Sequence, residues 1–534
     1  MNPIELSLFS SRIASICDEM GASLKRSAFS PNIKDRLDFS CAVFDATGQL
    51  TAQAAHIPVH LGSMAHAMEQ IVAAVDWQEG DMVVVNDPFM GGTHLPDVTV
   101  IAPVYEGGRL QAFVANRAHH ANIGASAPGS MPVSRRLEEE GVVIAPTHLL
   151  RNGQWCTAVL ERLAGLAPGS LAADFSGLQP QVMAAIGDFT AQASANRAGL
   201  ARLRQLIRRY GGERYQAQVR ALNDYGEELA RVSLRRIPPG RYRFCDHLDD
   251  DGAGTSRIPV CVTLEVEDGA VTVDFAGTSP QVPGNVNCPL SVAAAAVFYV
   301  FRCLMPEQIP ACAGVFRSIR LRAEPGTLLH ARYPAAVAAG NVETSTRLVD
   351  TVLGALAQAL PEQIPAASHG SMNNVAMGAI TGDGRRWDYY ETMGGGMGAS
   401  SRGPGLSGVQ THMTNTLNTP VESLELHYPL QVLRYSLRSG SGGAGVHAGG
   451  DGLVRELRFL QPATLSLLTE RRQSRPWGLA GGGAGAVGEN RLNGEPLGAK
   501  TTLQVRAGDV LSIATPGGGG WGRPDRVARI GSPG

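Results

Sequence analysis

The sequence predicts a multidomain protein of the mixed α/β (α+β) class, with mixed sheets, packed helices and a glycine-rich, β-containing C-terminal region. At 534 residues the chain is too long for one hydrophobic core. The hydrophobic period changes from 3.6 to 2 after Ile237-Pro238-Pro239-Gly240, and glycines cluster between short β runs from about Ser368. We therefore expect three domains: an α+β domain at 1–237, a β-meander with helices at 238–365, and a β-rich region at 366–534.

The first domain begins with apolar residues that recur every three or four positions between residues 4 and 27, which predicts an amphipathic helix. A hairpin is expected at 39–44 and 50–53, and Ser63 is placed to cap a helix that runs to Val75. Further on, the sequence predicts strands at 82–85, 98–105, 110–117 and 141–145, and helices at 188–210 and 214–237.

A polar, glycine-containing loop, Asn86 to Asp97, links the strand at 82–85 to the hairpin at 98–117. With the hairpin turn centred between Gly107 and Gly108, residues whose numbers sum to about 215 face each other, by the pairing rule for two-strand hairpins. Asp97 then faces Ala118, and His119 and His120 lie beside the loop that carries His94.

Two histidines and a carboxylate are thereby gathered at one end of a sheet, which indicates a metal site in the first domain. Imidazole and carboxylate ligands together suit Zn, Mn or Fe. The alternative is structural: His94 and Asp97 would form a hydrogen bond that orients the loop, and His119-His120 would lie partly at the surface. The glycine-rich backbone beside them favours the metal site.

The remaining elements follow the same periodicities. β runs are expected at 241–247, 257–267, 270–275, 318–323, 453–460, 464–469, 501–505 and 510–515, and helices at 290–304 and 344–360.

Composition and charge exclude several classes of protein. A hydrophobic content of 44% and a charged content of 18% are typical of a soluble globular protein. The formal net charge of −2 does not indicate binding to nucleic acid or to an anionic membrane. The longest apolar stretch, Leu290 to Leu304, contains Ser291 and Arg302 and is too short to span a bilayer.

The eight cysteines are scattered and contain no Cys-x-x-Cys. Several lie in apolar runs, as free core thiols do, which predicts a reducing, cytoplasmic location. The N-terminus, Met-Asn-Pro-Ile-Glu, lacks a basic region, so no signal peptide is expected. No phosphate-binding G-x-x-x-x-G-K-[ST] motif occurs, and neither G-x-G-x-x-G match (440–445 and 483–488) opens a helix after a strand.

Longer motifs resemble the hydantoinase B/oxoprolinase family over almost the whole chain. They are SPNIKDRLDFSCAVF (30–44), IPVHLGSM (57–64), NDPFMGGTHLPD (86–97), residues 117–132, GNVET (340–344), ETMGGGMGA (391–399), THMTNTLNTPVESLE (411–425) and PGGGGW (516–521). That family includes the second subunit of ATP-dependent N-methylhydantoinases and caprolactamases, the related half of oxoprolinases, and the large subunit of acetone and acetophenone carboxylases. Asn122 and Cys312 depart from the family pattern.

The resemblance implies a set of metal ligands. Carried over residue by residue from the ketone carboxylases, the ligand positions resemble Asp35, His94, Asp97 and His119. The family usually has Glu at the position of Asp35, so the shorter side chain would bind through water. His120 is the alternative ligand or a base beside the site.

The resemblance also implies a division of labour within a hetero-oligomer. A hydantoinase A-type nucleotide-binding partner would use ATP to phosphorylate the carbonyl oxygen of a hydantoin, 5-oxoproline or lactam. This chain would then complete the hydrolysis with a divalent metal, while His120 or His60 moves protons. The alternatives are a component of an ATP-dependent ketone carboxylase, whose large subunits are typically longer, and a non-catalytic assembly subunit.

Overall fold

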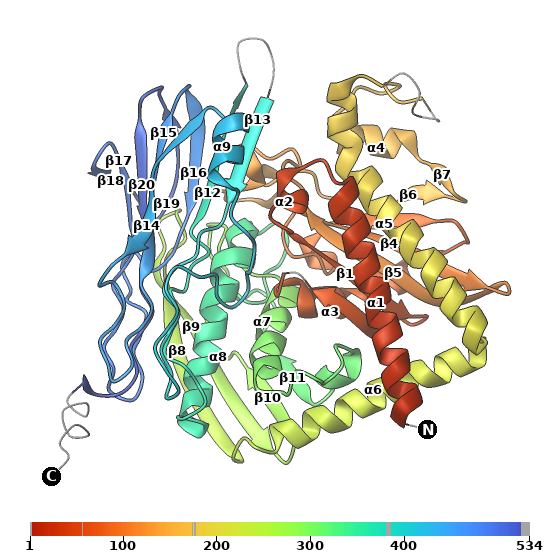
Figure 1. Cartoon of the computed structure of the whole chain (residues 1–534), viewed down its shortest axis with the longest axis horizontal. Helices are drawn as coiled ribbons and strands as arrows, with labels where there is room; N and C mark the ends of the chain where they lie inside the picture. The colour runs from red at the N-terminus through yellow and green to blue at the C-terminus, as the bar shows by residue number, and fades with distance from the viewer. Residues whose placement is uncertain (1–2, 56, 173–174, 176–177, 381–385, 525–534) are drawn as a thin grey trace.

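The computed structural model describes residues 3–55, 57–172, 175, 178–380 and 386–524. Within these residues the strands form four sheets, and helices pack against two of them (Figure 1). The mixed α/β, multidomain class predicted from the sequence is confirmed, whereas the division into three domains stays a prediction.

A seven-stranded sheet forms the N-terminal part, in the order β2-β1-β5-β4-β3-β6-β7. Its strands are β1 (Phe39–Asp45), β2 (Leu50–Ala55), β3 (Met82–Val85), β4 (Asp97–Glu106), β5 (Arg109–His119), β6 (Thr147–Arg151) and β7 (Gln154–Trp155). The helices around it are α1 (Pro3–Ser27), α2 (Pro31–Lys34), α3 (His60–Ala74), α4 (Thr157–Leu163) and α5 (Pro180–Tyr210).

Helices cover both faces of this sheet. Alternate residues of its central strands point to opposite sides, so each face presents apolar side chains to a helix. Val98 and Val100 of β4 pack into a core with α1 and α5, which lie across one face of the sheet (Figure 1). Ile101 and Phe113 pack into a separate core with α3 on the other face. The sheet is therefore buried on both sides.

The register of the central hairpin differs from the prediction by one residue. Near the turn, Glu106 pairs with Arg109, so the numbers sum to 215, but a bulge between Val104 and Tyr105 shifts every later pair to 216. Asp97 therefore faces His119 directly rather than Ala118. A bulge adds one residue to one strand, which a symmetric count from the turn cannot detect.

The predicted strand at 141–145 is wrong, because these residues belong to no strand of the described structure. The backbone N–H of Ile144 donates instead to the side chain of Asn86, at 2.7 Å. The strand next to β3 is β6, which begins at Thr147.

The middle of the chain is a four-stranded sheet in the order β11-β10-β9-β8. Its elements are β8 (Gly240–Asp250), β9 (Ser256–Glu267), β10 (Ala270–Asp274) and β11 (Ile319–Arg322), with helices α6 (Gly212–Leu234), α7 (Leu290–Cys303) and α8 (Ser345–Ala359). Helices α7 and α8 pack on this sheet in one continuous hydrophobic core.

Two cysteines of this sheet form a disulfide, Cys245 on β8 with Cys261 on β9. The prediction of free thiols is wrong for this pair, because the β8–β9 register places the two residues directly opposite each other. The other cysteines, Cys17, Cys41, Cys156, Cys288, Cys303 and Cys312, are free.

The C-terminal part is a β-sandwich with an apolar core between its two sheets. One sheet contains β12 (Asn374–Ile380), β13 (Arg386–Glu391), β16 (Ala463–Leu468) and β19 (Lys500–Val505). The other contains β14 (Leu430–Arg438), β15 (Gly452–Phe459), β17 (Glu489–Leu492), β18 (Glu495–Pro496) and β20 (Val510–Ala514), and the short helix α9 (Val421–His427) precedes β14. The sequence did not predict β12, β13 or β14.

Arg455 and Glu391 form a fully buried ion pair in this region. Among the described residues, no helix combines the length and the apolar character that crossing a bilayer demands.

Candidate metal centre

The loop after β3 is held in shape by its own side chains. The amide of Asn86 donates to the carbonyl oxygens of Leu95 and Val142, at 2.8 and 2.9 Å. Gly91 has a φ of +92°, and a Cβ built there would lie 2.0 Å from the Cβ of Ala67 on α3. Only glycine fits this close approach, so the loop is fixed against α3 and delivers His94 to the start of β4.

His94, Asp97 and His119 form a compact buried group at this sheet edge. His94 Nε2 and His119 Nδ1 each lie 3.2 Å from Asp97 Oδ1. One ligand atom from each of the three residues lies within 4.8 Å of the others. The sheet register brings Asp97 and His119 together, and the loop supplies His94.

A third histidine reaches the same carboxylate from α3. His60 Nε2 lies 3.4 Å from Asp97 Oδ2, and its Nδ1 lies 3.0 Å from the hydroxyl of Ser40. The hydroxyl of Thr93 donates to the same Asp97 oxygen at 2.5 Å. Both oxygens of Asp97 therefore have partners on several elements.

Charge in this group is concentrated on Asp97. Burial alone would raise the pKa of Asp97, but the nearby imidazoles of His94, His119 and His60 hold it well below its usual value. Burial lowers the pKa of His94, but Asp97 together with the charges of Glu140 and Asp38 raises it overall. The arrangement therefore favours an ionised carboxylate surrounded by imidazoles.

The donor set fits a cation. The Nε2 atoms of His60, His94 and His119 are buried, and none makes a well-formed hydrogen bond within the described residues. Buried polar atoms in proteins are nearly always satisfied, so three imidazoles with such nitrogens around one carboxylate match the ligands of Zn, Mn or Fe.

Residues outside the ligand group orient His94. Its Nδ1 lies 3.3 Å from the carbonyl oxygen of Ala338, which favours a proton on Nδ1 and leaves the lone pair on Nε2. The backbone N–H groups of Val337 and Ala338 donate to Glu140 Oε1 at 2.9 and 3.0 Å. Burial raises the pKa of Glu140 to about 7.

The cavity at this group is small, about 20 Å³. Its lining also includes Asp38, Asn341, Tyr390 and Thr392. Such a volume holds an ion or a water molecule, but not an organic ring.

Asp35 does not belong to this group. It is exposed at the end of α2 and lines a separate cavity of about 930 Å³. Leu37 has a φ of +58°, which turns the chain, and Asp38 instead faces the small cavity. The structure therefore places Asp38, and not Asp35, at the small cavity, and the backbone carbonyl oxygen of Asp38 accepts from the His119 N–H at 3.0 Å.

His120 points away from His119, as successive residues of a strand do. Its Nε2 lies 2.9 Å from Oε1 of Gln192 on α5, and its ring packs on Phe189. Burial lowers the pKa of His120. His120 lines the cavity of about 930 Å³, so the structure does not bring it into the small cavity with His94, Asp97 and His119.

Sequence reasoning missed Asn341, which lies on a π-helix at Gly340–Thr344. Its Nδ2 lies 3.4 Å from Asp97 Oδ2, and its Oδ1 is buried without a hydrogen bond in the described structure. Short π-helical segments are frequent at functional sites. The GNVET motif contained this residue, but nothing in it indicates contact with a loop more than 200 positions earlier.

The sequence of the whole chain is similar to that of a known protein family. Residues 2–524 match the family model described as Hydantoinase B/oxoprolinase. The chain is 40% identical to 5-oxoprolinase 1 of Arabidopsis thaliana over 97% of this chain, but that match covers 42% of the plant protein. It is 29% identical to a putative D-/L-hydantoinase subunit of Pseudomonas sp. (strain NS671), over 98% of this chain and 90% of that protein.

Among solved structures, the ATP-dependent caprolactamase from Pseudomonas jessenii superposes with a TM-score of 0.89 at 27% identity. This likeness covers 98% of the present chain and 92% of the caprolactamase chain.

Proposed function

Because the chain belongs to the hydantoinase B/oxoprolinase family, we propose that it is the metal-dependent catalytic subunit of an ATP-dependent cyclic amide hydrolase. Its substrate would be a hydantoin, 5-oxoproline or lactam that a partner protein has phosphorylated. The names of two similar proteins, a 5-oxoprolinase and an ATP-dependent caprolactamase, support the reaction class.

The observation that carries this proposal is the buried group of His94, Asp97 and His119, in which both imidazoles have a buried Nε2 without a well-formed hydrogen bond, as does the neighbouring His60. These three residues would hold a divalent ion, and Asp38 is close enough in the fold to line the same cavity. When bound, the ion would supply Lewis acidity for activating water or stabilising negative charge.

The chain's own residues would orient the ligand side chains and move protons. Asp97 fixes the rings of His94 and His119 through contacts of 3.2 Å. His60 is placed to take a proton at Nε2, because the Asp97 carboxylate at 3.4 Å would stabilise the resulting positive charge. His120, bound to Gln192, has no such position in the small cavity.

Space limits where the ring binds. The cavity of about 20 Å³ cannot accept it, whereas the cavity lined by His120, at about 930 Å³, can. We therefore propose that the ring first binds in the larger cavity and reaches the ion when the residues between the two cavities move.

A partner is part of the same proposal. The sequence contains no P-loop, and one relative is named as one subunit of a hydantoinase. We propose a hydantoinase A-type nucleotide-binding partner in a cytoplasmic hetero-oligomer.

The test is to purify the chain together with such a partner and measure ATP turnover and ring opening. Substrates would be a hydantoin, 5-oxoproline, caprolactam, and acetone with and without bicarbonate. Metal content would be measured by mass spectrometry on the same samples, with His94→Ala as the site variant and His447→Ala, outside both cavities, as its matched control.

We expect ring opening that depends on ATP and about one divalent ion per chain, with both lost in His94→Ala only. Turnover of acetone that requires bicarbonate would replace this proposal with the ketone carboxylase. An active complex without bound metal, unaffected by His94→Ala, would support the assembly role.

A further inference from the structure

A third cavity, of about 520 Å³, lies between β8 and the loop after β16. It shares no lining residue with the small cavity of the metal centre. Its volume is in the range of pockets that bind small molecules. The side chains that matter for its chemistry are Phe244, His247, Arg257, Arg471, Arg475 and Trp477.

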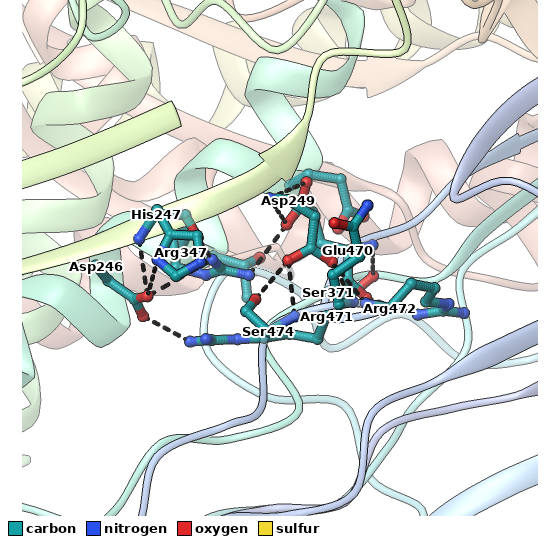
Figure 2. Close-up of polar contacts among 12 residues, drawn as sticks. Asp246, His247, Asp249, Arg347, Ser371, Glu470, Arg471, Arg472 and Ser474 are labelled. Carbon is teal, nitrogen blue, oxygen red and sulfur yellow. Dashed lines mark hydrogen bonds and ion pairs between the residues drawn. The ribbon is translucent and has the colours of Figure 1, made fainter. Parts of the chain in front are cut away.

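The two carboxylates of this cavity, Asp246 and Asp249, already have partners within the protein. Figure 2 shows Arg471 directed toward Asp246, which it contacts at 2.8 Å. Arg347 lies 3.8 Å from the other Asp246 oxygen. Burial alone would raise the pKa of Asp246, but Arg471 and Arg347 hold it at about 2. This carboxylate is ionised at neutral pH and fully paired.

Asp249 is held by the loop after β16. Its Oδ2 accepts from the backbone N–H groups of Arg472 and Gln473, at 2.6 and 2.9 Å. Its Oδ1 accepts from the hydroxyl of Ser474 at 2.5 Å (Figure 2). Since both oxygens are occupied, Asp249 shapes the loop and has no free oxygen for a ligand cation.

Two arginines at this cavity have no such partner. The side chains of Arg257 and Arg475 are exposed, and neither makes a hydrogen bond or ion pair within the described residues. Burial lowers the pKa of His247, and the nearby charges of Arg347 and Arg257 lower it further. The cavity is therefore net positive, with guanidinium groups available to carboxylate or phosphate oxygens.

An aromatic surface lies beside these cations. Phe244 and Trp477 pack edge to face with ring centroids 5.6 Å apart. Trp477 Nε1 is buried and has no hydrogen-bond partner in the described structure. Aromatic rings in a pocket favour a ligand with a planar or apolar part.

We propose that this cavity binds a small organic anion, whose carboxylate or phosphate contacts Arg257 and Arg475 and whose planar or apolar part contacts Trp477 and Phe244. The site is separate from the metal centre, so it does not depend on the proposed function.

The experiment is isothermal titration calorimetry of the full chain with three probes: AMP, 5-oxoproline and inorganic phosphate. AMP and 5-oxoproline distinguish phosphate from carboxylate recognition, and inorganic phosphate lacks the planar part. The variants are Arg257→Ala with Arg475→Ala, and Trp477→Leu. Arg220→Ala, an exposed arginine of α6, is the matched control, and circular dichroism checks that every variant is folded.

We expect saturable 1:1 binding of AMP or 5-oxoproline with a Kd of about 1 mM or lower. The double arginine variant should weaken it at least tenfold, and Arg220→Ala should leave it unchanged. Trp477→Leu should weaken the organic probes more than inorganic phosphate. The proposal is overturned if neither organic probe binds saturably, or if the folded double variant binds as well as the parent chain. If 5-oxoproline is the probe that binds, His94→Ala must leave that binding intact.

Discussion

Replacing Asp97 with asparagine removes one negative charge from the metal centre and leaves the side-chain volume almost unchanged. Asp97 is within 3.4 Å of His60 and 3.2 Å of both His94 and His119, so its charge acts on every imidazole of the group. Losing the carboxylate of a three-residue ligand group should raise the Kd for a divalent ion about 100-fold, or ~2.7 kcal/mol.

The change can be measured as stabilisation by the ion. At a free ion concentration of about 100 times the parent Kd, the parent chain gains ~2.7 kcal/mol, and the variant at the same concentration gains ~0.4 kcal/mol. Differential scanning fluorimetry with Zn or Mn should therefore show an ion-dependent rise in Tm for the parent that is nearly absent in Asp97→Asn.

The matched control is Asp268→Asn, a surface carboxylate that pairs with Arg235 at 3.0 Å. It should respond to the ion as the parent does. An equal rise in Tm for Asp97→Asn and the parent would refute the reasoning, because the ion would then be held elsewhere.

Three further predictions concern stability. Gly91→Ala should lower Tm and metal content, because a Cβ there would lie 2.0 Å from that of Ala67. The control Gly107→Ala also lies at a positive φ but has open space around it, so it should lower the free energy of unfolding in urea by only about 1 kcal/mol. Burial raises the Glu140 pKa from 4.5 to about 7, so the parent loses stability as pH rises from about 4.5 to about 7. Glu140→Gln should therefore match the parent near pH 4.5 and exceed its unfolding free energy by about 3 kcal/mol at pH 8. Equal differences in urea unfolding at both pH values would contradict this. Arg455→Met should cost about 3–5 kcal/mol by leaving Glu391 buried without its partner, and calorimetry should show a smaller loss when Glu391→Met is added.

The site residues that lie within one motif or one hairpin could be predicted from the sequence. His94 and Asp97 lie in one loop motif, and the hairpin turn at Gly107 and Gly108 was enough to bring His119 near them. The one-residue error came from the bulge at Val104, where the extra residue has no sequence signature. Pairing β1 with β5 would have found Asp38, since Phe39 lies opposite Ala118.

Other features depend on contacts between distant segments, which periodicity does not report. Asn341 reaches the centre from the π-helix, and β12 pairs with the distant strand β16, where Asn374 lies opposite Leu468. Cys245 and Cys261 meet only because β8 and β9 pair in one particular register.

Two contacts of the metal centre join residues 244 positions apart, His94 with Ala338 and Asp97 with Asn341. Contacts that close so long a stretch of chain form slowly, because its conformational entropy must be lost first. The N-terminal sheet would thus present its ligands to solvent before residues 338–341 cover them, and an ion would enter during that interval. Refolding with the ion added at the start, compared with adding it after folding is complete, should give faster loading in the first case; equal loading rates would show that the finished protein opens readily.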